Sequence, residues 1–143
     1  MNIQSYTLEQ MLALIKRGEV FAGQLESSGC IIKIEEYLPV VSTAIHAGHQ
    51  VRNDLVKLCQ LNAEERYLEE NPYTDELLAS QPITLACTDS RFEYDLNKPK
   101  SLSTYYKSAW QKQVWRKPLS DKQRAISQAK HNDFYILYQA ERC

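Results

Sequence analysis

The chain runs Leu38-Pro39-Val40-Val41-Ser42-Thr43-Ala44-Ile45 into His46-Ala47-Gly48-His49, and this passage gives the strongest prediction of architecture. The apolar run over residues 38–45 predicts a buried strand, and we expect residues 39–45 to form the central strand of a sheet. His46 and His49 then lie where that strand passes into a loop. Because α/β folds build their binding sites beyond the ends of strands, we expect a site here.

Helix and strand patterns alternate on either side of this passage. Capping boxes predict helices that begin after Thr7, Asn62 and Ser120. Shorter helices are expected over residues 51–58 and 75–79, the second capped by Asn71 or Thr74. The last helix should turn one face inward, made of Ile126, Ala129, Phe134, Leu137 and Tyr138.

Strands are expected over residues 20–25, 30–34, 83–87 and 91–96. The continuous apolar run at 83–87 suits a strand buried on both faces, whereas residues 91–96 alternate between apolar and charged side chains. The order of elements predicts one α/β domain over residues 1–143, with a mixed sheet flanked by helices.

The composition is that of an ordinary globular protein, with 43% hydrophobic residues, 24% charged residues and a net charge of -1. This balance gives no reason to expect a nucleic-acid or membrane partner. Glu9, Lys16 and Arg17 interrupt the first apolar stretch, which therefore does not resemble a signal sequence, and we expect a cytoplasmic protein.

The cysteines Cys30, Cys59, Cys87 and Cys143 form no Cys-x-x-Cys pair. A zinc site of four thiolates needs closer pairing, and Cys30 and Cys87 lie in apolar, strand-like runs. We therefore expect reduced cysteines that pack in the core.

The spacing of His46 and His49 allows both rings to converge on one metal ion. Gly48 between them permits backbone torsions that are closed to other residues. The alternative is that one ring is a hydrogen-bonded polar group at the strand end and the other is solvated.

Carboxylates around the start of the helix at 75–79 are candidate partners of these histidines. Asp75 can supply the oxygen ligand of a His/His/carboxylate zinc site, and Glu70 can act as general base. The alternative for Asp75 is that it only stabilises the N-terminus of the helix.

Arg91 is the candidate group for binding a carboxylate, because a guanidinium contacts both carboxylate oxygens. The alternative is an internal ion pair of Arg91 with Asp95 or Glu93. Asn97 can hold the following loop in a turn. Aromatic residues between lysines follow, and we expect them to pack this loop onto the sheet rather than to stack on nucleic acid: Tyr105, Tyr106, Trp110 and Trp115.

Five stretches in order resemble the N-formylglutamate amidohydrolase family, and the branch they look closest to is the one found beside flavohaemoglobin-associated proteins. They are Ala44-Ile45-His46-Ala47-Gly48-His49, Glu69-Glu70-Asn71-Pro72-Tyr73-Thr74-Asp75-Glu76-Leu77, Ser90-Arg91-Phe92-Glu93-Tyr94-Asp95-Leu96-Asn97, Val114-Trp115-Arg116-Lys117-Pro118-Leu119 and His131-Asn132-Asp133-Phe134-Tyr135.

The resemblance implies a zinc-dependent hydrolase that cleaves the linear amide of a small N-acyl amino acid. It also implies an α/β fold similar to the zinc carboxypeptidases and acyl-amino-acid deacylases, the phosphorylase/hydrolase-like folds. The implied roles are metal ligands for His46, His49 and Asp75, catalysis for Glu70 and Arg91, and substrate binding for Arg91 with Asp95 and Asn97 as its support.

Three departures from the family pattern change this expectation. Ile45 stands where a proline is common, and Asn71 stands where an aspartate is usual. The later Asp-Leu-His-Ser motif, which would provide another ligand, is absent, so we expect the amino-terminal part of such a domain. The alternatives are a catalytically silent relative that binds a small carboxylate or a protein, and a half-enzyme completed by a second copy or a partner.

Overall fold

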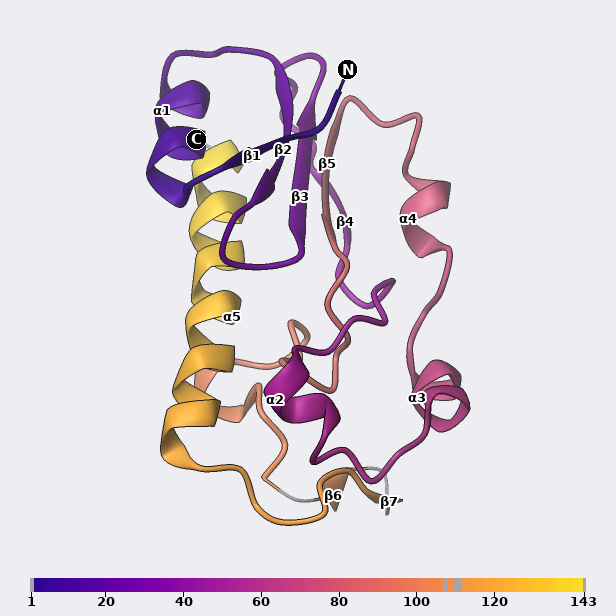
Figure 1. Ribbon diagram of the computed structural model, residues 1–143. Helices are drawn as coiled ribbons and strands as arrows, with labels where there is room; N and C mark the ends of the chain where they lie inside the picture. Colours follow the sequence, from indigo (N-terminus) through magenta and orange to yellow (C-terminus); the bar gives the residue numbers. More distant parts are fainter. Residues whose placement is uncertain (1, 107, 110–111, 143) are drawn as a thin grey trace.

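A computed structural model describes residues 2–106, 108–109 and 112–142, apart from the side chain of Arg142. A sheet occupies one end of the molecule, a long helix runs the length of one side, and loops with short helices fill the other end (Figure 1). In chain order the elements are β1 (Gln4–Tyr6), α1 (Leu8–Lys16), β2 (Phe21–Leu25), β3 (Cys30–Ile34), β4 (Ser42–Ala44), α2 (Asn53–Val56), α3 (Ala63–Glu69), α4 (Thr74–Leu77), β5 (Ile83–Cys87), η1 (Lys100–Leu102), β6 (Ser108–Ala109), β7 (Lys112–Gln113) and α5 (Asp121–Arg142).

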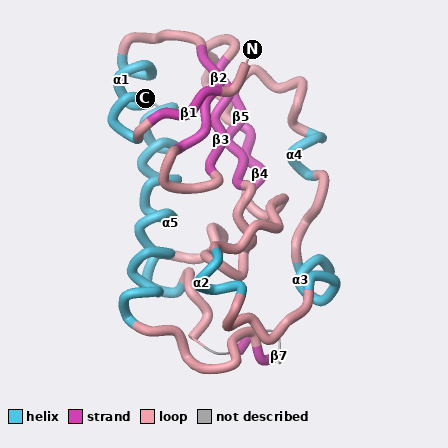
Figure 2. The backbone as a smooth tube through the Cα atoms, viewed as in Figure 1, coloured by secondary structure: helices cyan, strands magenta, loops and turns pink. Residues whose placement is uncertain are grey.

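The main sheet is mixed, with strand order β1-β2-β3-β5-β4 (Figure 2). β3 runs antiparallel to both β2 and β5, while β1 is parallel to β2 and β4 is parallel to β5. The predicted α/β class and mixed sheet are therefore confirmed. β1 lies in the polar segment that precedes the first predicted helix and was not expected.

The main core lies between one face of the sheet and helices α1 and α5. Ile32 and Leu85 of the sheet pack with Met11 of α1 and with Phe134 and Leu137 of α5, and all five are at most 2% exposed. The opposite sheet face carries Ala22, Ile31, Lys33, Thr84 and Ala86, which line a cavity of about 530 Å³. Burial of residues 83–87 on both faces was therefore a wrong prediction, since this face is open.

The run at residues 38–45 forms only a short strand at the sheet edge. β4 covers Ser42–Ala44 and pairs with β5 alone, and Val40 is 63% exposed. Pro39 has no N–H to donate to a ladder, which favours an edge. The prediction that residues 39–45 form the central strand was therefore wrong. The centre of the sheet is β3, and β5 lies between β3 and β4.

Residues 91–96 do not form a strand but begin with a turn. The predicted alternation fails because the charged positions are buried as well: Glu93 and Asp95 are both 0% exposed. Glu93 accepts from Lys130 Nζ at 2.6 Å and from the Arg52 backbone N–H at 2.8 Å. These pairings allow carboxylates to lie inside the molecule.

The predicted capping boxes are all present, and each joins a side chain to a backbone N–H three residues away. They lie at Thr7 with Gln10, Asn62 with Glu65 and Ser120 with Gln123. Tyr73 precedes α4 with φ 68°, and neither Asn71 nor Thr74 caps this helix by its side chain. The Thr74 hydroxyl instead donates to the Asn71 carbonyl at 2.8 Å.

Two further helix predictions need correction. The helix expected over residues 51–58 covers only Asn53–Val56. In α5, Ile126 and Ala129 are exposed, although both were predicted to face inward. The buried side chains of this helix are Ser127, His131, Phe134, Leu137 and Glu141. The inward face therefore includes polar groups that apolar periodicity does not detect.

The long loop packs down through Trp115, which is 0% exposed and donates from its indole N–H to the Tyr105 carbonyl at 2.9 Å. Tyr106, by contrast, is 59% exposed. Trp110 lies outside the described residues. Trp115 is buried, but it packs in a second apolar cluster with Leu55, Phe92 and Leu119 and not on the sheet. Packing onto the sheet was thus a wrong prediction for Trp115 and for the exposed Tyr106.

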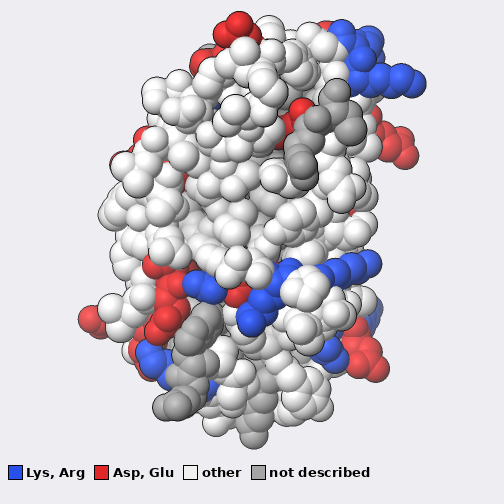
Figure 3. Space-filling view, turned by 180° about the vertical axis from the view of Figure 1, so that it is seen from behind, with Lys and Arg blue, Asp and Glu red and all other residues white. Residues whose placement is uncertain are grey.

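Cys30 and Cys87 are buried free thiols on directly paired positions of β3 and β5, as predicted for core cysteines. Cys59 is a partly buried free thiol, and Cys143 lies outside the described residues. Among the described residues, no helix has the length and apolar character needed to cross a membrane. On the face shown in Figure 3, basic and acidic side chains are interspersed and much of the surface is uncharged.

Candidate functional site

Both histidines that follow β4 are held by buried carboxylates. His46 Nε2 lies 2.8 Å from Asp95 Oδ1, and His49 Nδ1 lies 2.5 Å from Glu70 Oε1. The side chains of Asp95 and Glu70 are 0% and 1% exposed, whereas that of His49 is 39% exposed. The structure therefore joins each predicted histidine to a predicted acidic residue, as two separate pairs.

Gly48 brings these pairs against the end of β5. A Cβ at this position would lie 2.2 Å from the Thr88 carbonyl carbon, and the His49 backbone N–H donates to Thr88 O at 3.1 Å. Positive φ is confined among the described glycines to Gly18. Gly48 is thus required for close backbone approach and not, as predicted, for unusual torsions.

Two residues that the sequence analysis did not single out, Ser90 and Arg66, contact the His49–Glu70 pair. The Ser90 hydroxyl donates to Glu70 Oε2. Arg66 Nη1 donates to the His49 carbonyl at 2.8 Å, and Arg66 Nη2 lies 3.3 Å from His49 Nε2. Because a guanidinium only donates, Nε2 is the acceptor and Nδ1–H points to Glu70. Arg66 was detectable from its spacing to Glu70 on one helix face.

Asp95 is the centre of a second cluster. It accepts from the Tyr105 hydroxyl, from the Asn97 backbone N–H at 2.9 Å and from Arg91 Nη2 at 3.1 Å, in addition to His46. Burial alone would raise the pKa of Asp95, but these hydrogen bonds and the Arg91 charge together hold it well below its usual range. The ion pair between Arg91 and Asp95, one of the two alternatives, is therefore present.

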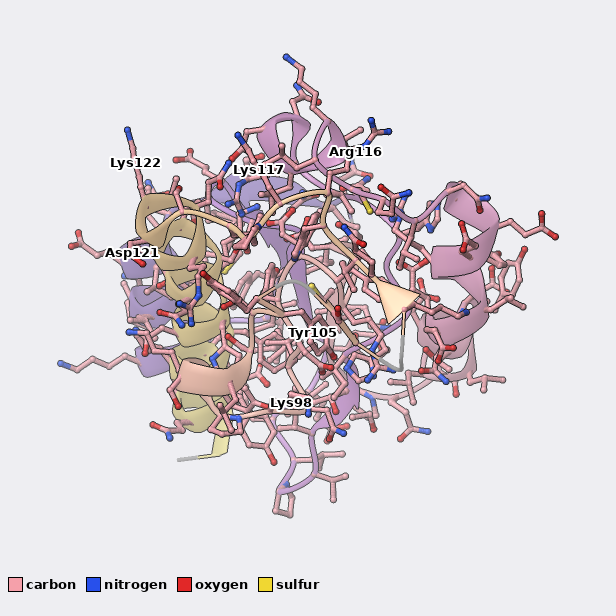
Figure 4. All side chains as sticks on the ribbon, turned by 90° about the horizontal axis from the view of Figure 1, so that it is seen from below. Lys98, Tyr105, Arg116, Lys117, Asp121 and Lys122 are labelled. Atoms are coloured by element: carbon pink, nitrogen blue, oxygen red, sulfur yellow. The ribbon has the colours of Figure 1, made fainter. Side chains whose placement is uncertain are left out.

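Arg91 lies at the wall of a cavity of about 400 Å³. Its Nη1 donates to the Glu69 carbonyl at 3.0 Å, so that contacts to Glu69 and Asp95 fix the guanidinium plane. The cavity is lined by Arg91, Asn97, Lys98, Tyr105, Ser108 and Ala109. In the view from below, Lys98 and Tyr105 lie near each other (Figure 4). The cavity thus combines two cations, an amide and a phenol, which is chemistry that suits an anionic ligand.

The predicted zinc ligands do not form a metal centre as they stand. Asp75 lies in α4 and lines the sheet-face cavity with His49, whereas neither His46 nor Asp95 is among the lining residues of that cavity. His49 Nε2 already accepts from Arg66. Within the described part of the chain, no group of three or more His, Cys, Asp or Glu side chains is placed to hold a metal ion. These residues therefore do not fit a zinc site with three protein ligands.

Of the predicted site residues, the structure brings Arg91, Asp95, Asn97 and His46 into one cluster and His49 and Glu70 into another. Lys98 and Tyr105 were missed as site residues. Lys98 is adjacent to Asn97, but its place in the cavity follows from the turn after Asp95, which apolar periodicity does not reveal.

In comparisons with known proteins, the chain matches no family model, no curated protein and no solved structure.

Proposed function

We propose that this chain binds a small carboxylate, in particular the carboxylate of an N-acyl amino acid, and that it is a catalytically silent relative of the N-formylglutamate amidohydrolases. The observation that carries the proposal is the cavity in which Arg91, Asn97 and Lys98 converge beside Tyr105. Its volume of about 400 Å³ lies within the range of small-molecule sites.

The contacts behind Arg91 favour binding because they fix the guanidinium before a ligand arrives. Asp95 and the Glu69 carbonyl hold two of its nitrogens. A preorganised guanidinium loses less conformational freedom on binding than a mobile one. Asp95 offsets the charge of Arg91, and Lys98 adds the positive charge that a carboxylate needs.

The choice of an N-acyl amino acid rests on the resemblance of residues 90–97 to the substrate-binding stretch of that family. Asn97 and Tyr105 at the same cavity offer amide and hydroxyl groups, which can hydrogen-bond to the amide of such a ligand. Catalytic silence is the part of the proposal that concerns metal chemistry, and it is supported by the separate pairing of His46 with Asp95 and of His49 with Glu70.

A second candidate function is metal-dependent hydrolysis of the N-acyl amino acid, and one observation favours it. The buried Asp95 holds His46 at Nε2, an arrangement typical of histidines that bind metal through their other nitrogen. In this case zinc would act as a Lewis acid on the amide, and a second copy or a partner would have to supply the missing ligand.

Isothermal titration with N-acetylglutamate tests the leading proposal, and its diamide serves as the uncharged analogue. We expect wild type to bind N-acetylglutamate and not its diamide. Arg91→Lys should bind N-acetylglutamate at least about tenfold more weakly than wild type, because a lysine cannot contact both carboxylate oxygens at once. Arg17→Ala, at an exposed position paired with Glu19, is the control and should bind like wild type.

Equal binding of acid and diamide, or unchanged binding by Arg91→Lys, would refute the carboxylate site. A hydrolysis assay with added zinc separates the two candidates. Turnover that His46→Ala abolishes would favour the hydrolase, and binding without turnover would favour the silent relative.

A further inference from the structure

The carboxyl-terminal turn of α5 buries a carboxyl group that lacks a partner. Glu141 is 7% exposed, and neither of its carboxyl oxygens has a hydrogen-bond donor among the residues that the structure describes. A buried carboxylate is strongly unfavourable unless N–H or O–H groups take the place of water. Glu141 is therefore a group that a ligand with donors would satisfy.

Two cavities meet at Glu141. The larger, of about 540 Å³, lies between the ends of α1 and α5, and its lining includes the cations Lys16 and Arg17. The smaller, of about 460 Å³, is lined by Pro39, Val40, Val41, Tyr138 and Glu141, with no cation among its described lining residues. The lining of the smaller cavity therefore includes three residues with apolar side chains, an aromatic ring and a single acid.

We propose that the cavity between residues 39–41 and Tyr138 binds a primary alkylammonium ion, with the ammonium group at Glu141. Three N–H donors on one nitrogen can serve both carboxyl oxygens. The hydrocarbon arm of the ligand would lie on Pro39, Val40 and Val41, which removes apolar surface from water. The ring of Tyr138 adds attraction for a cation.

The site is independent of the carboxylate cavity at Arg91, with which it shares no lining residue. The two cations of the larger cavity, Lys16 and Arg17, differ in whether they can pair with the Glu141 carboxylate. Arg17 is already paired, with its Nε 2.6 Å from Glu19 Oε1. Among the described lining residues of the two cavities, Lys16 is the side chain whose own ammonium is a rival for Glu141.

Burial raises the pKa of Glu141 to about 8, so its carboxyl holds a proton at neutral pH and must release it when an ammonium ion binds. The other titratable or charged groups around it are Lys16 and Arg17 at the end of α1, Tyr37 after β3, Cys30 in β3 and Tyr138 in α5. Affinity should therefore rise about tenfold from pH 6 to pH 7 and about fivefold from pH 7 to pH 8.

Isothermal titration of the full chain with hexylamine tests the proposal, and hexanol is the uncharged analogue. We expect wild type to bind hexylamine with release of about one proton at pH 7, as read from buffers of different ionisation enthalpy. Glu141→Gln should weaken binding at least tenfold while remaining folded by circular dichroism. Glu9→Gln, an exposed change on α1, should bind like wild type.

Equal binding of hexylamine by Glu141→Gln, or equal binding of hexanol by wild type, would overturn the proposal. Absence of binding by wild type would overturn it too. If wild type does not bind hexylamine but Lys16→Met does, then the ammonium group of Lys16 occupies the site in the native protein and no external amine binds there.

Discussion

Asp95 links four groups of the candidate site: the His46 ring, the Tyr105 hydroxyl, the Asn97 backbone N–H and the Arg91 guanidinium. These contacts keep it ionised inside the molecule, since its pKa lies well below the usual range. A residue with this many partners fixes the geometry of the cavity at Arg91, although it does not line that cavity itself.

Asp95→Asn should lower the free energy of unfolding by about 3 kcal/mol, because it leaves His46 and Arg91 without their buried anion. Urea denaturation measures this loss. Asp54→Asn is the matched control: the side chain of Asp54 is 47% exposed and pairs with Arg52 Nε at 2.8 Å, and the change should cost less than about 1 kcal/mol because water solvates Asp54. Equal losses in the two variants would contradict the account of Asp95.

At the residue scale, sequence patterns identified both histidines and most of their partners, but not the pairing. His46 and Asp95 are 49 residues apart, and His49 and Glu70 are 21 apart. Such contacts depend on the path of the chain between them, which local spacing does not determine. The Arg91–Asp95 ion pair, in contrast, spans only four residues, and local spacing was enough to name it as one of two alternatives.

At the scale of elements, the capping boxes were predictable because each is a contact over three residues. The place of β4 at the sheet edge was not, because an apolar run does not tell how many neighbours a strand has. The buried carboxylates of residues 91–96 also defeated the alternation rule, since the partners of Glu93 come from α5 and from the loop after His49.

Gly48 gives a test at this scale, because it is where the chain after β4 meets the end of β5. Gly48→Ala should destabilise the fold by about 1–3 kcal/mol, since the new Cβ would lie 2.2 Å from backbone. Thermal unfolding measures the loss. Gly18→Ala, where φ is 68° but no atom lies within 4 Å of the new Cβ, should cost less, about 1 kcal/mol. A smaller loss at Gly48 than at Gly18 would contradict the close approach.

At the scale of the whole molecule, the main sheet is covered by helices on one face, and the other face lines an open cavity. The mixed α/β class followed from the order of helix and strand patterns. The open face of the sheet could not be predicted in this way, because residues such as Ile31 and Ala86 are apolar enough to suit a strand covered on both faces.

Glu141 makes the stability of the whole molecule depend on pH. Its pKa is raised from 4.5 to about 8 by burial, so between these values the folded chain retains a proton that the unfolded chain has lost. Stability should therefore fall as pH rises through this range, by at most about 1.4 kcal/mol per pH unit from this group. Glu141→Gln should remove that slope, which chemical denaturation at several pH values measures. An unchanged slope would contradict the buried, unpartnered carboxyl.

The most direct test of the central claim is a heteronuclear NMR titration of the full chain with N-acetylglutamate. We expect chemical-shift changes at the Arg91 side-chain N–H and at the backbone amides of Asn97 and Lys98, with none in β1. Changes confined to the sheet-face cavity around His49 and Ala86, or no change anywhere, would contradict it.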